Sequence, residues 1–128
     1  MFTIHSTSSD RELIFLDLRG EQFTFELRGH GLQVTREVST YTDPFGLLEF
    51  FTKLGSYERP WEGSPAWASL EDEFKISASC SNLGVGIFSL KLSGLPGIPE
   101  EWQASFSLTS ELGQLPKIAS SARSFFRP

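Results

Sequence analysis

The sequence contains very little cysteine and histidine. Cys80 is the only cysteine, so the chain cannot form an internal disulfide. The two histidines, His5 and His30, lie far apart in the sequence and do not have the spacing of a metal-binding motif. Cys80 falls on the apolar side of an expected strand, which is typical of a buried thiol rather than a nucleophile. We therefore expect no metal centre, no cofactor and no enzymatic activity.

Long hydrophobic segments are also missing. No apolar run approaches the roughly 18 residues that a membrane-spanning helix requires. Residues 1–5 lack the basic and hydrophobic parts of a secretion signal. Together with the single cysteine, these features favour a reducing compartment, and we expect a cytoplasmic protein that does not contact membranes.

Basic residues are too few and too dispersed for a nucleic-acid-binding protein. The chain carries 11 Lys and Arg against 16 Asp and Glu, for a formal net charge of −5. Residues 43–75 hold seven acidic side chains against three basic ones. Because affinity for phosphates needs clustered Lys and Arg, we exclude nucleic acid as a partner. An acidic belt favours a basic partner, although it can also serve only to keep the protein soluble.

Apolar and polar residues alternate regularly in two parts of the chain. Residues 70–109 are expected to form a three-stranded antiparallel meander, because this period of two is typical of half-buried strands and Asn82 and Gly84 suit a tight turn. Residues 1–42 show the same alternation. We expect this amino-terminal meander to contain strands at residues 2–5, 12–18, 23–28 and 32–38.

Two further segments have helical periodicity. In residues 43–55, Asp43 and Pro44 are suited to cap and begin a helix, and apolar residues then recur at three- and four-residue spacing. Residues 113–127 carry a second apolar stripe, and Pro116 lies at the start of this expected helix. For 128 residues, this order predicts a single α+β domain. We expect a curved, mainly antiparallel sheet of about six to seven strands, with both helices packed on one face.

Residues 56–69 lack periodicity and are rich in aromatic side chains, so we expect a structured loop. Functional residues often lie on loops, and an aromatic side chain with a charged rim is a common recognition surface. We predict that this loop and the acidic residues after it contact a partner, through Glu58, Trp61, Glu62, Trp67, Glu71, Asp72 and Glu73. The alternative for both tryptophans is a structural role as lids on the core.

Four segments of the chain resemble those of an uncharacterised family of small bacterial proteins. They are residues 40–43 (Thr-Tyr-Thr-Asp), 61–63 (Trp-Glu-Gly), 67–74 (Trp-Ala-Ser-Leu-Glu-Asp-Glu-Phe) and 113–119 (Gly-Gln-Leu-Pro-Lys-Ile-Ala). More remotely, the plan of meander, helix, glycine-turn hairpin and final helix is similar to that of the WapI-type immunity proteins. Those proteins neutralise contact-delivered toxins by binding them, and often carry Gly-His where this chain has Gly84-Val85. The remoter resemblance implies occlusion of a basic toxin, often a nuclease, without catalysis.

The residues leave a second function open. The 12 phenylalanines can line a pocket for a small apolar ligand between the sheet and the first helix, or they can simply fill a core. Either function is compatible with self-association through an edge strand, and the sequence does not decide the oligomeric state.

Overall fold

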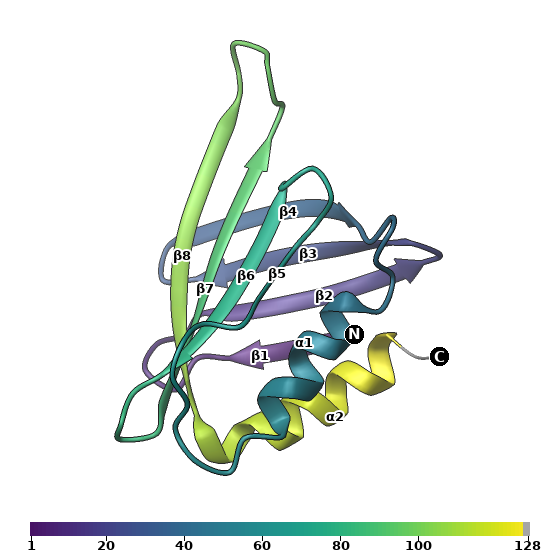
Figure 1. The fold of residues 1–128 in the computed structure, drawn as a ribbon. Coiled ribbons are helices and arrows are strands. Elements are labelled where there is room, and N and C mark those ends of the chain that lie inside the picture. Colours follow the sequence, from purple (N-terminus) through teal and green to yellow (C-terminus); the bar gives the residue numbers. More distant parts are fainter. Residues whose placement is uncertain (127–128) are drawn as a thin grey trace.

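The computed structural model describes residues 1–126, which form eight strands, two α-helices and one turn of 3-10 helix (Figure 1). In chain order they are β1 (Phe2–His5), β2 (Glu12–Arg19), β3 (Gln22–Gly29), β4 (Leu32–Ser39), α1 (Gly46–Gly55), β5 (Ala66–Ala68), β6 (Phe74–Cys80), β7 (Val85–Gly94), β8 (Trp102–Glu111), η1 (Leu112–Gln114) and α2 (Leu115–Phe126).

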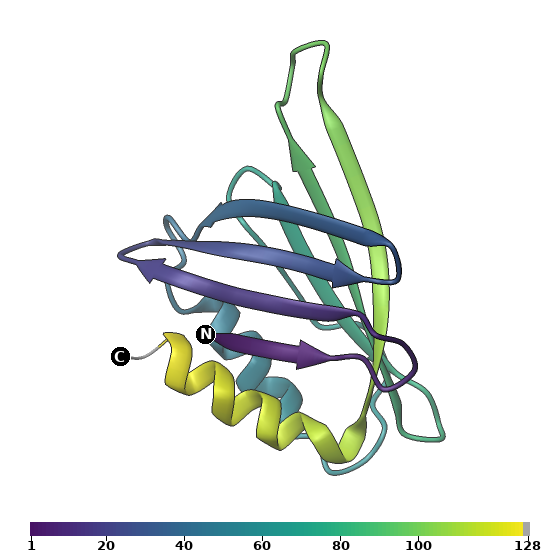
Figure 2. The ribbon, with the colours of Figure 1, turned by 180° about the vertical axis from the view of Figure 1, so that it is seen from behind.

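The strands form two separate four-stranded antiparallel sheets. Sheet A has the order β1-β2-β3-β4, and sheet B has the order β5-β6-β7-β8. The strands of sheet B run across those of sheet A in both views (Figures 1 and 2). The predicted α+β class, the antiparallel pairing and the two helices are confirmed. The prediction of one curved sheet of six to seven strands is wrong.

The break between the sheets falls at α1 and the loop that follows it. Because the chain travels through residues 40–65 between β4 and β5, no short turn ties the two meanders edge to edge. Alternation with a period of two is a local property, so it identifies strands without specifying which meander pairs with which. β5 also lies inside residues 56–69, which were predicted to be a loop, since three residues are too few to show a period.

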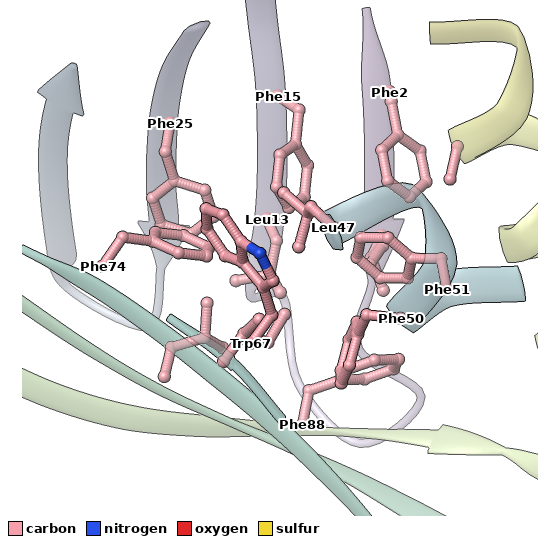
Figure 3. Packing of buried hydrophobic residues seen from close by; sticks show 14 of the residues in the cluster. Phe2, Leu13, Phe15, Phe25, Leu47, Phe50, Phe51, Trp67, Phe74 and Phe88 are labelled. Carbon is pink, nitrogen blue, oxygen red and sulfur yellow. The ribbon is translucent and has the colours of Figure 1, made fainter. Parts of the chain in front are cut away.

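The core lies where sheet A faces both helices and sheet B (Figure 3). On one side, Phe2 of β1 packs against Phe51 of α1, with ring centroids 5.1 Å apart. On the other, Phe25 of β3 packs against Phe74 of β6 at 5.0 Å. Phe15 of β2 contacts both Phe51 and Phe74. Ten of the 12 phenylalanines are buried, so these rings fill the core that joins the three layers.

Helix α1 ends at Gly55 as predicted but begins at Gly46, and its N-cap residue Phe45 makes no side-chain capping hydrogen bond. The Asp43 carboxylate was predicted to cap this helix, and that prediction is wrong. It instead accepts a hydrogen bond from the indole N–H of Trp67, over 3.0 Å. A partly buried indole N–H that lost its acceptor would destabilise the fold, so Trp67 takes the carboxylate that the helix end would otherwise use.

Helix α2 packs directly on α1 beside β1 (Figure 2). It covers residues 115–126 of the predicted segment 113–127. Residues 113 and 114 of that segment belong to η1, and residue 127 lies outside the described residues. The two helices approach closely at Gly55, where an added Cβ would lie 2.5 Å from the Cβ of Ala119. Gly55 therefore permits the helix contact as well as ending α1.

Candidate protein interface

The seven residues predicted to contact a partner do not form one surface. Glu58 and Glu62 are exposed in the loop before β5, whereas Glu71 and Asp72 are exposed in the turn after it. β5 runs between these two segments, which places them at opposite ends of that strand (Figure 1). The acidic belt of the sequence is therefore two separate acidic groups in the fold.

Both tryptophans of the predicted site pack inward. Trp67 is only 8% exposed and lies among the core side chains in Figure 3. Trp61 stacks on Tyr57 with ring centroids 4.4 Å apart and an interplanar angle of 15°, and both rings pack against the core. The Trp61 Nε1 atom is buried and has no hydrogen-bond partner within residues 1–126. The geometry thus favours the role of lids, because Trp67 is buried and Trp61 is partly buried against the core.

The turn between β5 and β6 is held by local hydrogen bonds. The Ser69 amide donates to the Phe74 carbonyl over 3.0 Å, and the Phe74 amide donates to the Ser69 hydroxyl over 3.1 Å. Asp72 adopts a left-handed backbone conformation with φ of 59°. This compact turn directs Glu73 towards β4, where the Ser39 amide donates to Glu73 Oε1 over 3.4 Å.

The fold brings this turn together with β4 and with the connection between β7 and β8. These three elements line a groove of about 720 Å³, which we call the inter-sheet groove. Its lining residues are Gln22, Thr35, Arg36, Glu37, Ser39, Tyr41, Leu70, Glu71, Glu73, Leu95 and Trp102. Two of the residues predicted from the sequence, Glu71 and Glu73, therefore lie in the groove, and Asp72 stands between them in the chain.

Large apolar side chains are exposed around this groove. Tyr41 is 60% exposed, Leu70 62% and Leu95 45%. Trp102 lies over Gly94, its cross-strand neighbour at the base of the β7–β8 connection. Exposed apolar side chains that gather beside polar residues mark interaction surfaces more reliably than the same side chains scattered singly. This group is therefore a candidate for such a surface.

Charge in the inter-sheet groove is unevenly balanced. Three acidic side chains, Glu37, Glu71 and Glu73, line it together with one basic side chain, Arg36. The Arg36 Nε and Glu73 Oε2 atoms are buried, and neither has a hydrogen-bond partner among the described residues. An unsatisfied buried polar group costs about 1–3 kcal/mol. The groove as a whole presents a surplus of acidic side chains.

Four groove residues were not predicted from the sequence, namely Arg36, Tyr41, Leu95 and Trp102. They come from separate elements that only the tertiary fold brings together. One signal was available in the sequence, because Leu95 is a large apolar residue beside Pro96 and Gly97 in a turn, where polar residues are usual. Its φ of 52° is uncommon for a residue other than glycine.

Among the described residues, no histidine or cysteine lines the inter-sheet groove. Within residues 1–126, no group of three or more His, Cys, Asp and Glu side chains is placed to hold a metal ion. Cys80 was predicted to be buried but is partly exposed at the end of β6, because the strand leaves the core there. His5 lies 3.3 Å from the carboxylate of Glu12 on the neighbouring strand. In the same residues, no helix is long and apolar enough to cross a membrane.

Comparison with known proteins adds a family assignment. A family model described as a family of unknown function, DUF6228, matches residues 6–128. No curated protein and no solved structure matches the chain. Because the family model covers nearly the whole sequence, the chain belongs to the family of unknown function DUF6228.

Proposed function

We propose that this protein is a non-catalytic protein-binding module whose inter-sheet groove receives a basic protein partner. The observation that carries the proposal is the gathering of exposed apolar side chains and surplus acidic side chains on one groove. Apolar anchors surrounded by a polar rim supply most of the affinity in protein interfaces. Acidic side chains in the same place would speed the approach of a basic partner and discriminate against acidic ones.

We further propose that the partner is a toxin and that the protein acts as an immunity protein by covering it. The remote resemblance to WapI-type immunity proteins supports this choice, as does the net charge of −5, which suits a basic nuclease. Inhibition by occlusion requires a complementary surface and no chemical step. The scarcity of histidine and cysteine is compatible with such a role.

The decisive experiment first identifies the gene immediately upstream and, where it encodes a toxin domain, co-expresses that domain with this protein. The expected result is a stable complex that suppresses toxicity. Leu70→Ala combined with Leu95→Ala should weaken the complex by at least about tenfold, because both anchors are lost. Leu83→Ala is the matched control, since Leu83 is 92% exposed in the turn between β6 and β7, away from the groove. Equal weakening by both sets of changes would contradict the proposed surface.

Charge reversal separates the two acidic groups. Glu37→Lys together with Glu71→Lys should slow association with a basic partner and reduce its dependence on salt concentration. Glu58→Lys together with Glu62→Lys changes the net charge by the same amount at the other end of β5, and should have the smaller effect. Stopped-flow association rates at low and high ionic strength measure both pairs. A larger effect of the second pair would move the interface to the Trp61 loop.

A further inference from the structure

Within residues 1–126, three of the four edge strands are short or partly covered. β1 contains four residues and β5 contains three. At the outer edge of β8, the Thr7 amide donates to the Thr109 carbonyl over 3.0 Å, and the Arg11 guanidinium donates to the Ser107 carbonyl over 2.8 Å. The loop between β1 and β2 therefore occupies the edge of β8 and ties the two sheets together.

β4 is different, because it is a long edge strand on the rim of the inter-sheet groove. It contains eight residues and pairs with β3 along its whole length without a register shift. It has no proline, lysine or bulge, which are devices that commonly protect a sheet edge. Its charged residues, Arg36 and Glu37, restrict which chain can pair there but leave the main-chain edge open.

Two hydrogen bonds show which main-chain groups of β4 point outward. The Thr40 amide donates to the Glu21 carbonyl, on the side of β3. The preceding amide, of Ser39, donates in the opposite direction to Glu73 on the turn before β6. Main-chain groups on successive residues of a strand point to opposite sides. The amides and carbonyls that face away from β3 are therefore those of Gln33, Thr35 and Glu37.

We propose that the partner binds by adding a strand to this edge: an extended basic segment of the partner protein pairs with β4 inside the inter-sheet groove. The Thr35 and Glu37 main-chain groups supply the hydrogen bonds, as in other cases of strand addition. The Lys or Arg side chains of the added segment lie beside Glu37, Glu71 and Glu73, which line the groove. This inference rests on the proposed function and specifies how the groove binds.

Charge favours a basic segment over a second copy of this chain. A second copy brings a net charge of −5 to a groove that already holds three acidic side chains against one basic side chain. A cationic segment instead neutralises that surplus of negative charge, and its main chain pairs with the outward amides and carbonyls of β4. In the resulting complex, sheet A gains a fifth strand and β4 becomes an interior strand.

The test uses the whole protein labelled with ¹⁵N and a capped octapeptide of alternating valine and lysine as the probe. In the free protein, the Thr35 and Glu37 amides should exchange with solvent at least about tenfold faster than the Val34 and Arg36 amides, because only the latter pair with β3. Titration to about 1 mM, the range of weak contacts, should shift the Thr35 and Glu37 resonances saturably and slow their exchange. An octapeptide of valine and glutamate should leave them unchanged.

Thr35→Pro removes the outward N–H while leaving the β3 hydrogen bonds of its neighbours in place. It should weaken binding of the valine–lysine peptide by about tenfold, the effect of one unmade hydrogen bond. Thr35→Ala keeps the N–H and should bind as the unchanged protein does. Thermal unfolding of both variants establishes that each is folded.

Three results would overturn strand addition: no shift at Thr35 and Glu37 up to about 1 mM, equal binding by the proline and alanine variants, or protection of these amides that rises with protein concentration alone. The last result would assign the edge to a second copy. The peptide experiment contains no toxin, so its failure leaves the toxin complex to be judged by co-expression. If co-expression yields no toxin complex, the peptide experiment still tests whether the β4 edge binds an added strand.

Discussion

The core and the inter-sheet groove draw apolar residues from the same short segment but use them differently. Phe74, at the start of β6, is fully buried and packs against rings from sheet A. Leu70, in the turn just before it, is 62% exposed and lines the groove. Burial of Phe74 stabilises the fold through the hydrophobic effect. Leu70 contributes little to folding, so its apolar surface remains available to a partner.

This difference separates residues that maintain the fold from residues that can bind. The core holds ring pairs in edge-to-face and stacked contacts, which are worth about 0.5–1.5 kcal/mol beyond their burial. The groove combines exposed apolar side chains with buried polar atoms that lack partners. Substitutions in the two regions should therefore affect different measurements.

The largest effect is expected for Phe15→Ala, in the middle of the core. Phe15 is fully buried and contacts rings from both sheets and both helices. Its truncation should lower the free energy of unfolding by about 3–5 kcal/mol, because it leaves a cavity that the surrounding layers cannot fill. Urea denaturation followed by circular dichroism measures this loss. Phe45→Ala, at a position that is 58% exposed, should change stability by less than about 0.5 kcal/mol.

A smaller loss is expected when Trp67 loses its acceptor. Asp43→Ala leaves the indole N–H without a partner and should lower the free energy of unfolding by about 1–3 kcal/mol. Asp43→Asn retains an oxygen that can accept from Trp67 and should cost less. The same denaturation experiment measures both variants. Equal losses would indicate that the charge of Asp43, rather than its hydrogen bond, is what matters.

The contact between the helices should tolerate little extra volume. Gly55→Ala places a methyl group against Ala119, at a distance that real Cβ atoms do not adopt. Overpacking costs about 1–3 kcal/mol, and the better helix propensity of alanine offsets part of it, so we expect a net loss of about 1–2 kcal/mol. Gly113→Ala is the matched control because nothing lies within 4 Å of its added Cβ. Thermal melting should show a lower midpoint for Gly55→Ala only.

The smallest effect on stability is expected in the groove. Leu70→Ala should change the free energy of unfolding by less than about 0.5 kcal/mol, since the side chain is mostly exposed. The same change should lower the affinity for a basic partner by about tenfold or more, because Leu70 is an anchor of the proposed interface. Calorimetric titration measures the affinity, and urea denaturation measures the free energy of unfolding. A large loss of stability would instead show that Leu70 stabilises the folded protein, as Phe74 does.

Much of the secondary structure was predictable because its signals are local. The alternation at Phe74, Ile76 and Ala78 identified β6, and its apolar residues are buried as expected. The three- and four-residue spacing in α1 likewise identified its buried face. The start of α1 was not predictable in the same way. Asp43 and Pro44 have the local features of a helix start, but the hydrogen bond to Trp67 depends on a residue in another element.

The candidate site was only partly predictable. Glu71 and Glu73 were identified because they are acidic residues that precede a strand. Trp61 and Trp67 were chosen for their residue type, yet the fold turns both inward to cover apolar neighbours. Exposure depends on which other elements are within reach of a side chain, and no local pattern contains that information.

Local patterns were enough to predict seven of the eight described strands, both helices and the surplus of acidic charge, because periodicity and composition act through residues that are close in the chain. The division of the strands into two sheets, the separation of the acidic belt into two groups and the open edge of β4 beside Leu70 and Glu73 could be seen only in the folded structure. These features depend on contacts between segments that lie far apart in sequence. Their formation is governed by the packing of whole sheets and helices around one core.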